Sequence, residues 1–132
     1  MSVASILALV TASVLVLSDT PAAAQVKVEE IVPEARPVLM WLDAVKIGDL
    51  DRFKTAFSER MRQQFEKQGW ATVLMTYQDN FRQAFGDYRL EDFVFQFTGG
   101  ADSGYVSIVH QGKKLPALSV VKEKNEWKVN ER

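Results

Sequence analysis

The chain has 132 residues, which suits a single domain, and its content of 47% hydrophobic and 25% charged residues is usual for a folded protein. Its 16 basic and 17 acidic residues nearly cancel, so the composition favours neither nucleic-acid binding nor attachment to an anionic membrane surface. The absence of cysteine excludes disulfides, a thiol nucleophile and a lipid-bearing cysteine.

The first element in the chain is an uncharged apolar stretch, residues 3–17, which is too short to span a bilayer. Three alanines, residues 22–24, follow it, and small residues at that place are typical of a signal-peptidase site. We therefore expect residues 1–24 to be a signal peptide that is cleaved before Gln25, and the protein to be periplasmic or secreted. Because no Lys or Arg precedes the apolar stretch, an uncleaved anchor is the alternative. The 108 residues after the site carry no net formal charge.

After a polar lead-in, residues 25–32, one domain is expected over residues 33–132. Its first helical segment is marked by prolines at 33 and 37, since proline is tolerated in a first helical turn. Apolar residues then recur at helical spacing: Val38, Trp41, Leu42 and Val45. Gly48 is suited to the left-handed position that ends a helix.

Two further helical segments are predicted before Gly86. Asp49 is a plausible N-cap for the second, Ser58 is a break and second cap within it, and Gly69 ends it. The third segment carries apolar residues on one face: Val73, Leu74, Tyr77, Phe81 and Phe85. These aromatic residues are interpreted as core.

Beyond Gly86 the apolar period becomes two, which is typical of strands. Four strands are predicted, at residues 88–98, 105–111, 115–122 and 127–129. The first has Phe93, Phe95 and Phe97 on one face. Pro116 lacks a backbone donor and is expected at a strand start or a sheet edge. The sequence therefore predicts an α+β domain of three N-terminal helices packed on a curved, four-stranded antiparallel sheet.

Two stretches resemble the nuclear-transport-factor-two-like superfamily. Residues 41–51, with the Gly48-Asp49 pair, resemble the end of its first helix, and residues 120–129, with Trp127, resemble its terminal hairpin. The resemblance covers about residues 33–131 and is closest to small exported bacterial members without an assigned activity. It implies a cystatin-like cone of helices and curved sheet with an open mouth. It does not imply one function, because the superfamily includes isomerases and dehydratases as well as proteins that are not enzymes.

Residues suited to acid–base chemistry are few. His110 is the single histidine, and it shares a predicted strand face with Val106 and Ile108. Asp43 lies on the first helix between apolar neighbours, off the main stripe. The resemblance implies that an enzyme of this kind would use one of these two as general base, with a tyrosine as partner. One histidine and no cysteine cannot form a compact transition-metal site, and no cofactor is expected.

Trp41, Tyr77 and Tyr105 are the predicted ligand contacts, because each joins a large apolar body to one polar atom. Core packing is the alternative for all three. The favoured function is a non-catalytic accessory domain that binds a small apolar ligand or a periplasmic protein partner, and the rival is an isomerase- or dehydratase-type enzyme. A third hypothesis is a homodimer through the outer sheet face, where Tyr105, Val109 and Ala117 supply apolar area.

These hypotheses differ in what they require of the interior. An enzyme requires His110 or an aspartate within hydrogen-bond reach of a tyrosine inside a pocket. A binding protein requires a cavity of several hundred Å3 lined by aromatic residues and no such pair. If the three phenylalanines at 93, 95 and 97 fill the interior, the interaction hypothesis is favoured.

Overall fold

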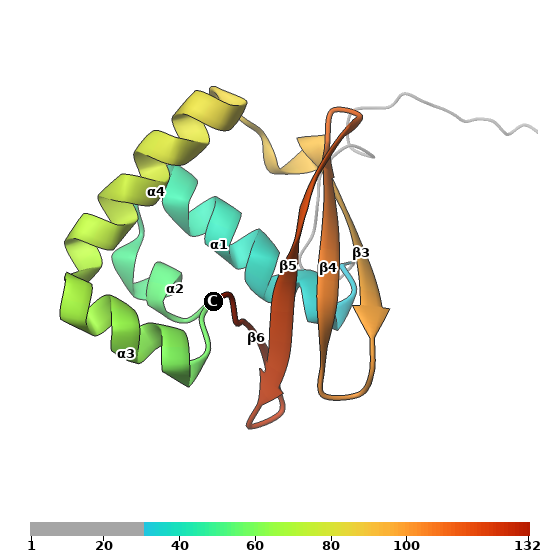
Figure 1. The fold of residues 1–132 in the computed structure, drawn as a ribbon. Coiled ribbons are helices and arrows are strands. Elements are labelled where there is room, and N and C mark those ends of the chain that lie inside the picture. The colour runs from blue at the N-terminus through green and yellow to red at the C-terminus, as the bar shows by residue number, and fades with distance from the viewer. Residues whose placement is uncertain (1–30) are drawn as a thin grey trace, which may run out of the picture.

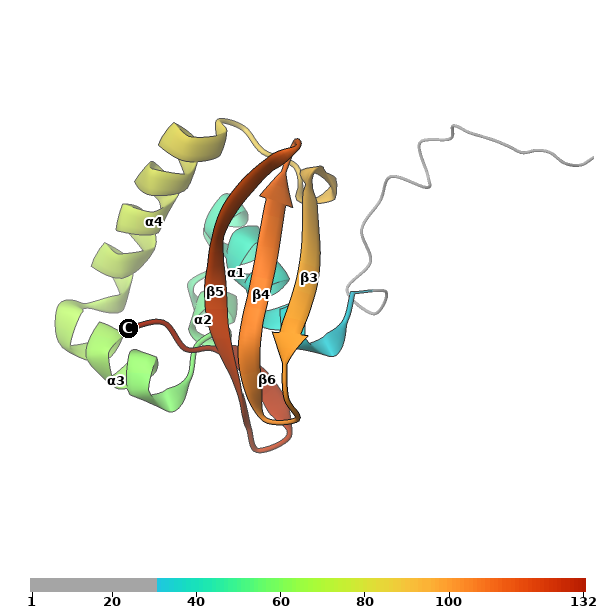
Figure 2. The ribbon, with the colours of Figure 1, turned by 45° about the vertical axis from the view of Figure 1, so that its right-hand side comes forward.

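The computed structural model describes residues 31–132 (Figure 1). The predicted signal peptide, residues 1–24, and most of the predicted lead-in, residues 25–32, lie outside the described residues. The described part is an α+β structure in which helices pack on a four-stranded antiparallel sheet, as the sequence predicts. The α-helices lie on one side of the sheet, and Figure 2 looks onto the face that no described helix covers.

The helical half begins with a short 3-10 turn, η5 (Pro33–Ala35), and helix α1 (Arg36–Ile47). Pro37 lies in the first turn of α1, and Gly48 ends the helix with a left-handed φ of 73°, so both predicted boundaries are confirmed. Most of α1 is buried, and the buried residues lie on more than one side: Pro37, Val38, Leu39, Trp41, Leu42, Ala44 and Val45. This helix therefore lies between the sheet and the other helices.

The predicted second helical segment is divided at its predicted break, Ser58, into two helices, α2 (Leu50–Lys54) and α3 (Glu59–Gln68). The described residues thus hold four α-helices rather than three. The chain leaves the helical path because its backbone is bound by the last strand. Val129 donates a hydrogen bond to the Ala56 carbonyl, and Ser58 donates one to the Val129 carbonyl, both at 2.8 Å. A partner more than 70 residues away in sequence therefore binds the backbone at the predicted break.

The two predicted caps are confirmed. The Asp49 carboxylate accepts a hydrogen bond from the Arg52 backbone N–H at 3.1 Å at the start of α2. The Ser58 hydroxyl accepts one from the Met61 backbone N–H at 3.3 Å at the start of α3. Helix α4 (Trp70–Phe85) follows directly after Gly69, as predicted.

The sheet has its strands in chain order, each antiparallel to the next. The strands are β3 (Phe93–Gly99), β4 (Ser103–His110), β5 (Lys113–Glu123) and β6 (Glu126–Val129). Short turns join them, and the register brings Phe93 opposite His110 and Val120 opposite Val129. Three of the four predicted strands agree with this sheet to within two residues at each end.

The predicted first strand is wrong over residues 88–92. Tyr88 lies in the connection after α4, and residues 90–92 form a 3-10 turn, η6 (Leu90–Asp92). The Asp92 carboxylate accepts a hydrogen bond from the Arg89 N–H at 3.1 Å, which closes this turn. Period-two hydrophobicity continues through the segment, but local side-chain bonds and the burial of Tyr88 against α1 hold it out of the sheet.

Pro116 lies at an irregular place in the sheet. Val106 pairs with Leu118 but Ile108 pairs with Leu115, so the two residues between the leucines face one residue of β4 in a β-bulge. β6 pairs with only the last four residues of β5, so this stretch of β5 has no strand on its other side. The expectation that Pro116 lies at an edge is therefore confirmed.

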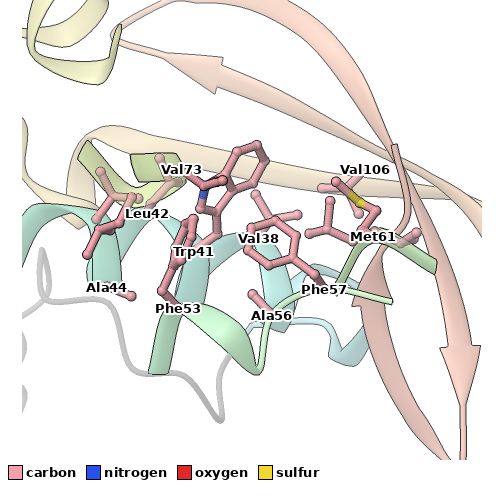
Figure 3. Packing of buried hydrophobic residues seen from close by; sticks show 14 of the residues in the cluster. Val38, Trp41, Leu42, Ala44, Phe53, Ala56, Phe57, Met61, Val73 and Val106 are labelled. Carbon is pink, nitrogen blue, oxygen red and sulfur yellow. The ribbon is translucent and has the colours of Figure 1, made fainter. Parts of the chain in front are cut away.

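The hydrophobic core joins α1 to the other helices and to the inner face of the sheet (Figure 3). Phe53 and Phe57 are fully buried and lie edge to face, with ring centroids 4.9 Å apart. Of the three phenylalanines of β3, Phe93 is buried, whereas Phe95 and Phe97 pack only partly against the core. These rings therefore do not fill the whole space between the helices and the sheet.

Candidate functional site

An apolar cavity of about 260 Å3 lies between helices α1 and α4 and the inner face of the sheet. All of its lining residues are apolar: Val38, Trp41, Leu42, Phe81, Ala84, Phe85, Phe93, Ile108, Leu115, Pro116 and Leu118. Other hollows of 340 to 590 Å3 include charged side chains such as Lys46, Lys67 and Lys128 in their walls. Its all-apolar lining distinguishes this cavity from the others, and such a lining is compatible with an apolar molecule.

The helical and strand periods of the sequence determine which side chains form the walls of the cavity. Val38 and Trp41 are one helical turn apart on α1, and both are buried. Phe93 and Ile108 come from the inward positions of neighbouring strands and are also buried. The wall is thus made of side chains that are already packed, which favours a preformed cavity.

The rim of the cavity is exposed. Ala84, near the end of α4, and Pro116, in the bulge of β5, are both lining residues and both exposed. Ala84 has a small side chain, and the bulge displaces β5 locally, so neither closes the gap between helix and strand. The opening therefore lies between the last turn of α4 and the start of β5.

Trp41 is the predicted ligand contact that lines this cavity. Its ring packs edge to face on Tyr77 at 5.0 Å between centroids and also contacts Phe81 and Phe57. The indole Nε1 is buried and has no hydrogen-bond partner among the described residues. Because Nε1 has almost no accessible surface, Trp41 presents carbon rather than its N–H to the cavity.

The two predicted tyrosines lie elsewhere. Tyr77 is half-buried behind Trp41, next to Phe53 and Phe65, and does not line the cavity. Burial raises the pKa of Tyr77, and the Glu131 charge adds to the effect. Tyr105 is 59% exposed, and its neighbours across the strands are polar, so it lies on the outer face of the sheet.

His110 lies next to the cavity rather than in its wall. It shares a strand face with Val106 and Ile108, as the sequence predicts, and it is buried. Its ring centroid is 4.6 Å from that of Phe93 and 4.9 Å from that of Phe85, and both phenylalanines line the cavity. The imidazole Nε2 is buried without a hydrogen-bond partner among the described residues. His110 is therefore not a lining residue of the cavity, although its ring packs against two of the rings that are.

Asp43 forms an ion pair with Arg52, which joins α1 to α2. This pairing is a structural role, and Asp43 is not among the lining residues. In the described part of the chain, no tyrosine is hydrogen-bonded to Asp43 or to His110. The paired acid–base arrangement that the isomerase hypothesis requires is therefore not formed by these residues.

Tyr88 is a structural residue that sequence reasoning missed. Its hydroxyl donates a hydrogen bond of 2.5 Å to the Leu42 carbonyl of α1, and Leu42 lines the cavity. The Lys46 ammonium lies 5.2 Å from the centre of the Tyr88 ring and bonds to the Tyr88 carbonyl and to Asp87. These contacts fix the connection after α4 against α1. Only the partner on α1 identifies this role, so no local signal indicates it.

Replacing Tyr88 with phenylalanine is expected to lower the free energy of unfolding by about 0.5–1.5 kcal/mol, because a buried hydrogen bond is lost. Burial raises the pKa of Tyr88 strongly, and the Asp43 charge adds to this. Above about pH 10 the unfolded chain loses this proton while the folded chain keeps it, so the stability of the wild type falls. Urea unfolding between pH 7 and 11 should show that the free energy of unfolding falls less steeply with pH in Tyr88→Phe than in the wild type. If the free energy of unfolding falls equally steeply with pH in both proteins, the prediction is wrong.

The described residues contain no group of three or more histidine, cysteine, aspartate or glutamate side chains that could hold a metal ion. None of the helices in residues 31–132 is both long and apolar enough to span a membrane. Comparison with known proteins finds no match for this chain among protein-family models, curated proteins or solved structures.

Proposed function

We propose that this protein is an exported, non-catalytic accessory protein that binds a small apolar molecule. The apolar cavity between α1, α4 and the sheet is the observation that carries the proposal. Its lining includes four aromatic rings, those of Trp41, Phe81, Phe85 and Phe93. Such a lining stabilises an apolar molecule by removing its surface from water.

The absence of polar lining residues favours binding over catalysis. General acid–base chemistry requires a titratable group within hydrogen-bond reach of the reacting atom. Neither candidate lines the cavity: the His110 ring packs against Phe85 and Phe93, and Asp43 is paired with Arg52. A molecule held in this cavity would therefore be stored, carried or presented, and left chemically unchanged.

Export rests on the sequence of residues 1–24, whose apolar stretch and terminal alanines are typical of a signal peptide. The resemblance to small exported members of the nuclear-transport-factor-two-like superfamily supports the same assignment. We place the protein in the periplasm or outside the cell on these grounds. Mass spectrometry of the protein purified from its native compartment would detect both cleavage before Gln25 and any retained small molecule.

The binding proposal is tested with Ala84→Trp, which places an indole at the exposed rim of the cavity. The probe is N-phenyl-1-naphthylamine, whose fluorescence rises when it leaves water. Only its naphthyl ring of ten carbon atoms needs to enter the cavity, and the amine and the phenyl ring stay at the exposed rim. We expect the probe to bind the wild type and Ala84→Trp to weaken binding by about tenfold or more, since the indole takes the place of apolar contact area.

Gln83→Trp is the matched control, because it adds the same side chain one position away on α4, where the residue is exposed and does not line the cavity. This variant should bind the probe like the wild type. If neither variant changes the affinity, or if the wild type does not bind the probe, the cavity is not the binding site and the proposed function fails. Circular dichroism of both variants checks that they fold.

A further inference from the structure

We infer that the group held in the cavity is a bare hydrocarbon of roughly ten carbon atoms, with any polar group of the ligand left at the mouth. This inference rests on the proposed binding function and adds the chemical class and size of the ligand. Three features of the structure support it: the volume of the cavity, the absence of hydrogen-bonding atoms in its wall, and the position of its opening.

The volume sets the size of the bound group. An engineered cavity of about 150 Å3 with a lining of Leu, Ile and Phe stays free of water and binds benzene, which has six carbon atoms. The cavity described above has about 260 Å3 and a comparable lining. Scaled by volume, it accommodates a group of roughly ten carbon atoms. A four-ring polycyclic molecule is too large for it.

The wall sets the polarity of the bound group. Trp41 Nε1 and His110 Nε2, the buried side-chain polar atoms without a partner among the described residues, have almost no accessible surface. The Tyr88 hydroxyl already donates its hydrogen bond to the Leu42 carbonyl. A hydroxyl or carboxyl group inside the cavity would therefore lose its water and gain no partner, which is unfavourable.

The opening sets the orientation of the ligand. Ala84 and Pro116 are exposed at the rim, whereas Val38, Phe93 and Ile108 are buried deeper in the wall. A polar end at the rim keeps its contact with water, and the apolar end fills the interior. The ligand that fits is thus an amphiphile or a plain hydrocarbon, bound by its apolar part.

A series of straight-chain alcohols tests the inference, with each alcohol displacing N-phenyl-1-naphthylamine from the wild-type protein. From 1-hexanol upward, we expect the affinity to rise by about fourfold for each added methylene. The gain should stop near ten carbons, where the cavity is full. Extra carbons then remain in water, so 1-dodecanol should bind no more tightly than 1-decanol.

The matched control is 1,10-decanediol, which has the length of 1-decanol and a second hydroxyl at its far end. We expect it to bind about tenfold or more weakly than 1-decanol, because the second hydroxyl enters the apolar interior without a partner. Equal affinities for diol and alcohol, or affinities that do not depend on chain length, would overturn the inference while probe binding still supports the proposed function. If the wild type does not bind the probe at all, the proposed function fails with it.

Discussion

Replacing Trp41 with alanine is expected to lower the free energy of unfolding by about 3–5 kcal/mol, the usual cost of removing a buried aromatic side chain. Trp41 is 6% exposed, and its ring contacts Phe57, Tyr77 and Phe81. The same substitution removes one wall of the apolar cavity. Urea unfolding followed by circular dichroism measures the loss of stability.

Tyr105→Ala is the matched control for this prediction, because Tyr105 is an aromatic residue with 59% of its surface exposed. It should change the free energy of unfolding by no more than about 0.5 kcal/mol, as is usual for surface positions. Should Trp41→Ala prove as stable as Tyr105→Ala, Trp41 does not support the core. Its packing against three aromatic rings would then need another explanation.

Replacing Gly104 with alanine is expected to lower the free energy of unfolding by about 1–3 kcal/mol, the usual cost of overpacking a well-packed place. A Cβ at Gly104 would lie 2.5 Å from the Thr98 carbonyl oxygen and 2.6 Å from the Phe97 ring. The Thr98 oxygen belongs to the backbone of β3, so it moves only if the β3–β4 pairing is disturbed. Thermal and urea unfolding should both show the loss.

Gly100 provides the control for the hairpin, since it lies in the turn between β3 and β4 and a Cβ there would meet no atom within 4 Å. Gly100→Ala is therefore expected to be nearly neutral or slightly stabilising, because alanine reduces the freedom of the unfolded chain. Similar destabilisation by both substitutions would show that the close approach of β3 and β4 at Gly104 does not govern the stability of the hairpin.

Local chemistry explains why much of the fold is predictable. Asp49 and Ser58 cap helices through backbone groups three residues away, and Gly48 ends a helix through its own φ angle. Each of these signals acts within one helical turn, so a sequence pattern contains it. The change of period near Gly86 likewise separates the helical half from the strands.

The errors in the prediction arise where a distant partner decides the structure. The segment between Leu50 and Gln68 forms two separate helices rather than one helix with a break at Ser58, because Val129 binds the backbone at residues 56–58. Tyr88 leaves the predicted strand because it bonds to Leu42 of α1. Sequence periodicity contains neither partner, since both lie more than 40 residues away.

In the candidate site, too, local sequence patterns predict some features, and only tertiary packing decides the others. The sequence predicts Trp41 as a ligand contact from its amphipathic side chain. It also predicts that His110 shares a strand face with Ile108, because the strand period determines which residues point the same way. The sequence predicts both Trp41 and Tyr105 as ligand contacts, although Trp41 lies in the cavity wall and Tyr105 on the outer face of the sheet. The two residues have the same amphipathic chemistry, and only the packing of the sheet against the helices distinguishes them.

By itself, then, the sequence of this protein determined the α+β class, the order of helices and strands, and the caps and turns between them, because these depend on neighbours in the chain. The tertiary structure alone decided that α4 ends beside the bulge at Pro116 and leaves an apolar cavity between them. It also decided that His110 packs against Phe85 and Phe93 outside the cavity lining and that Asp43 is paired with Arg52. A cavity is formed by side chains from elements far apart in sequence, so its volume and polarity depend on how those elements pack.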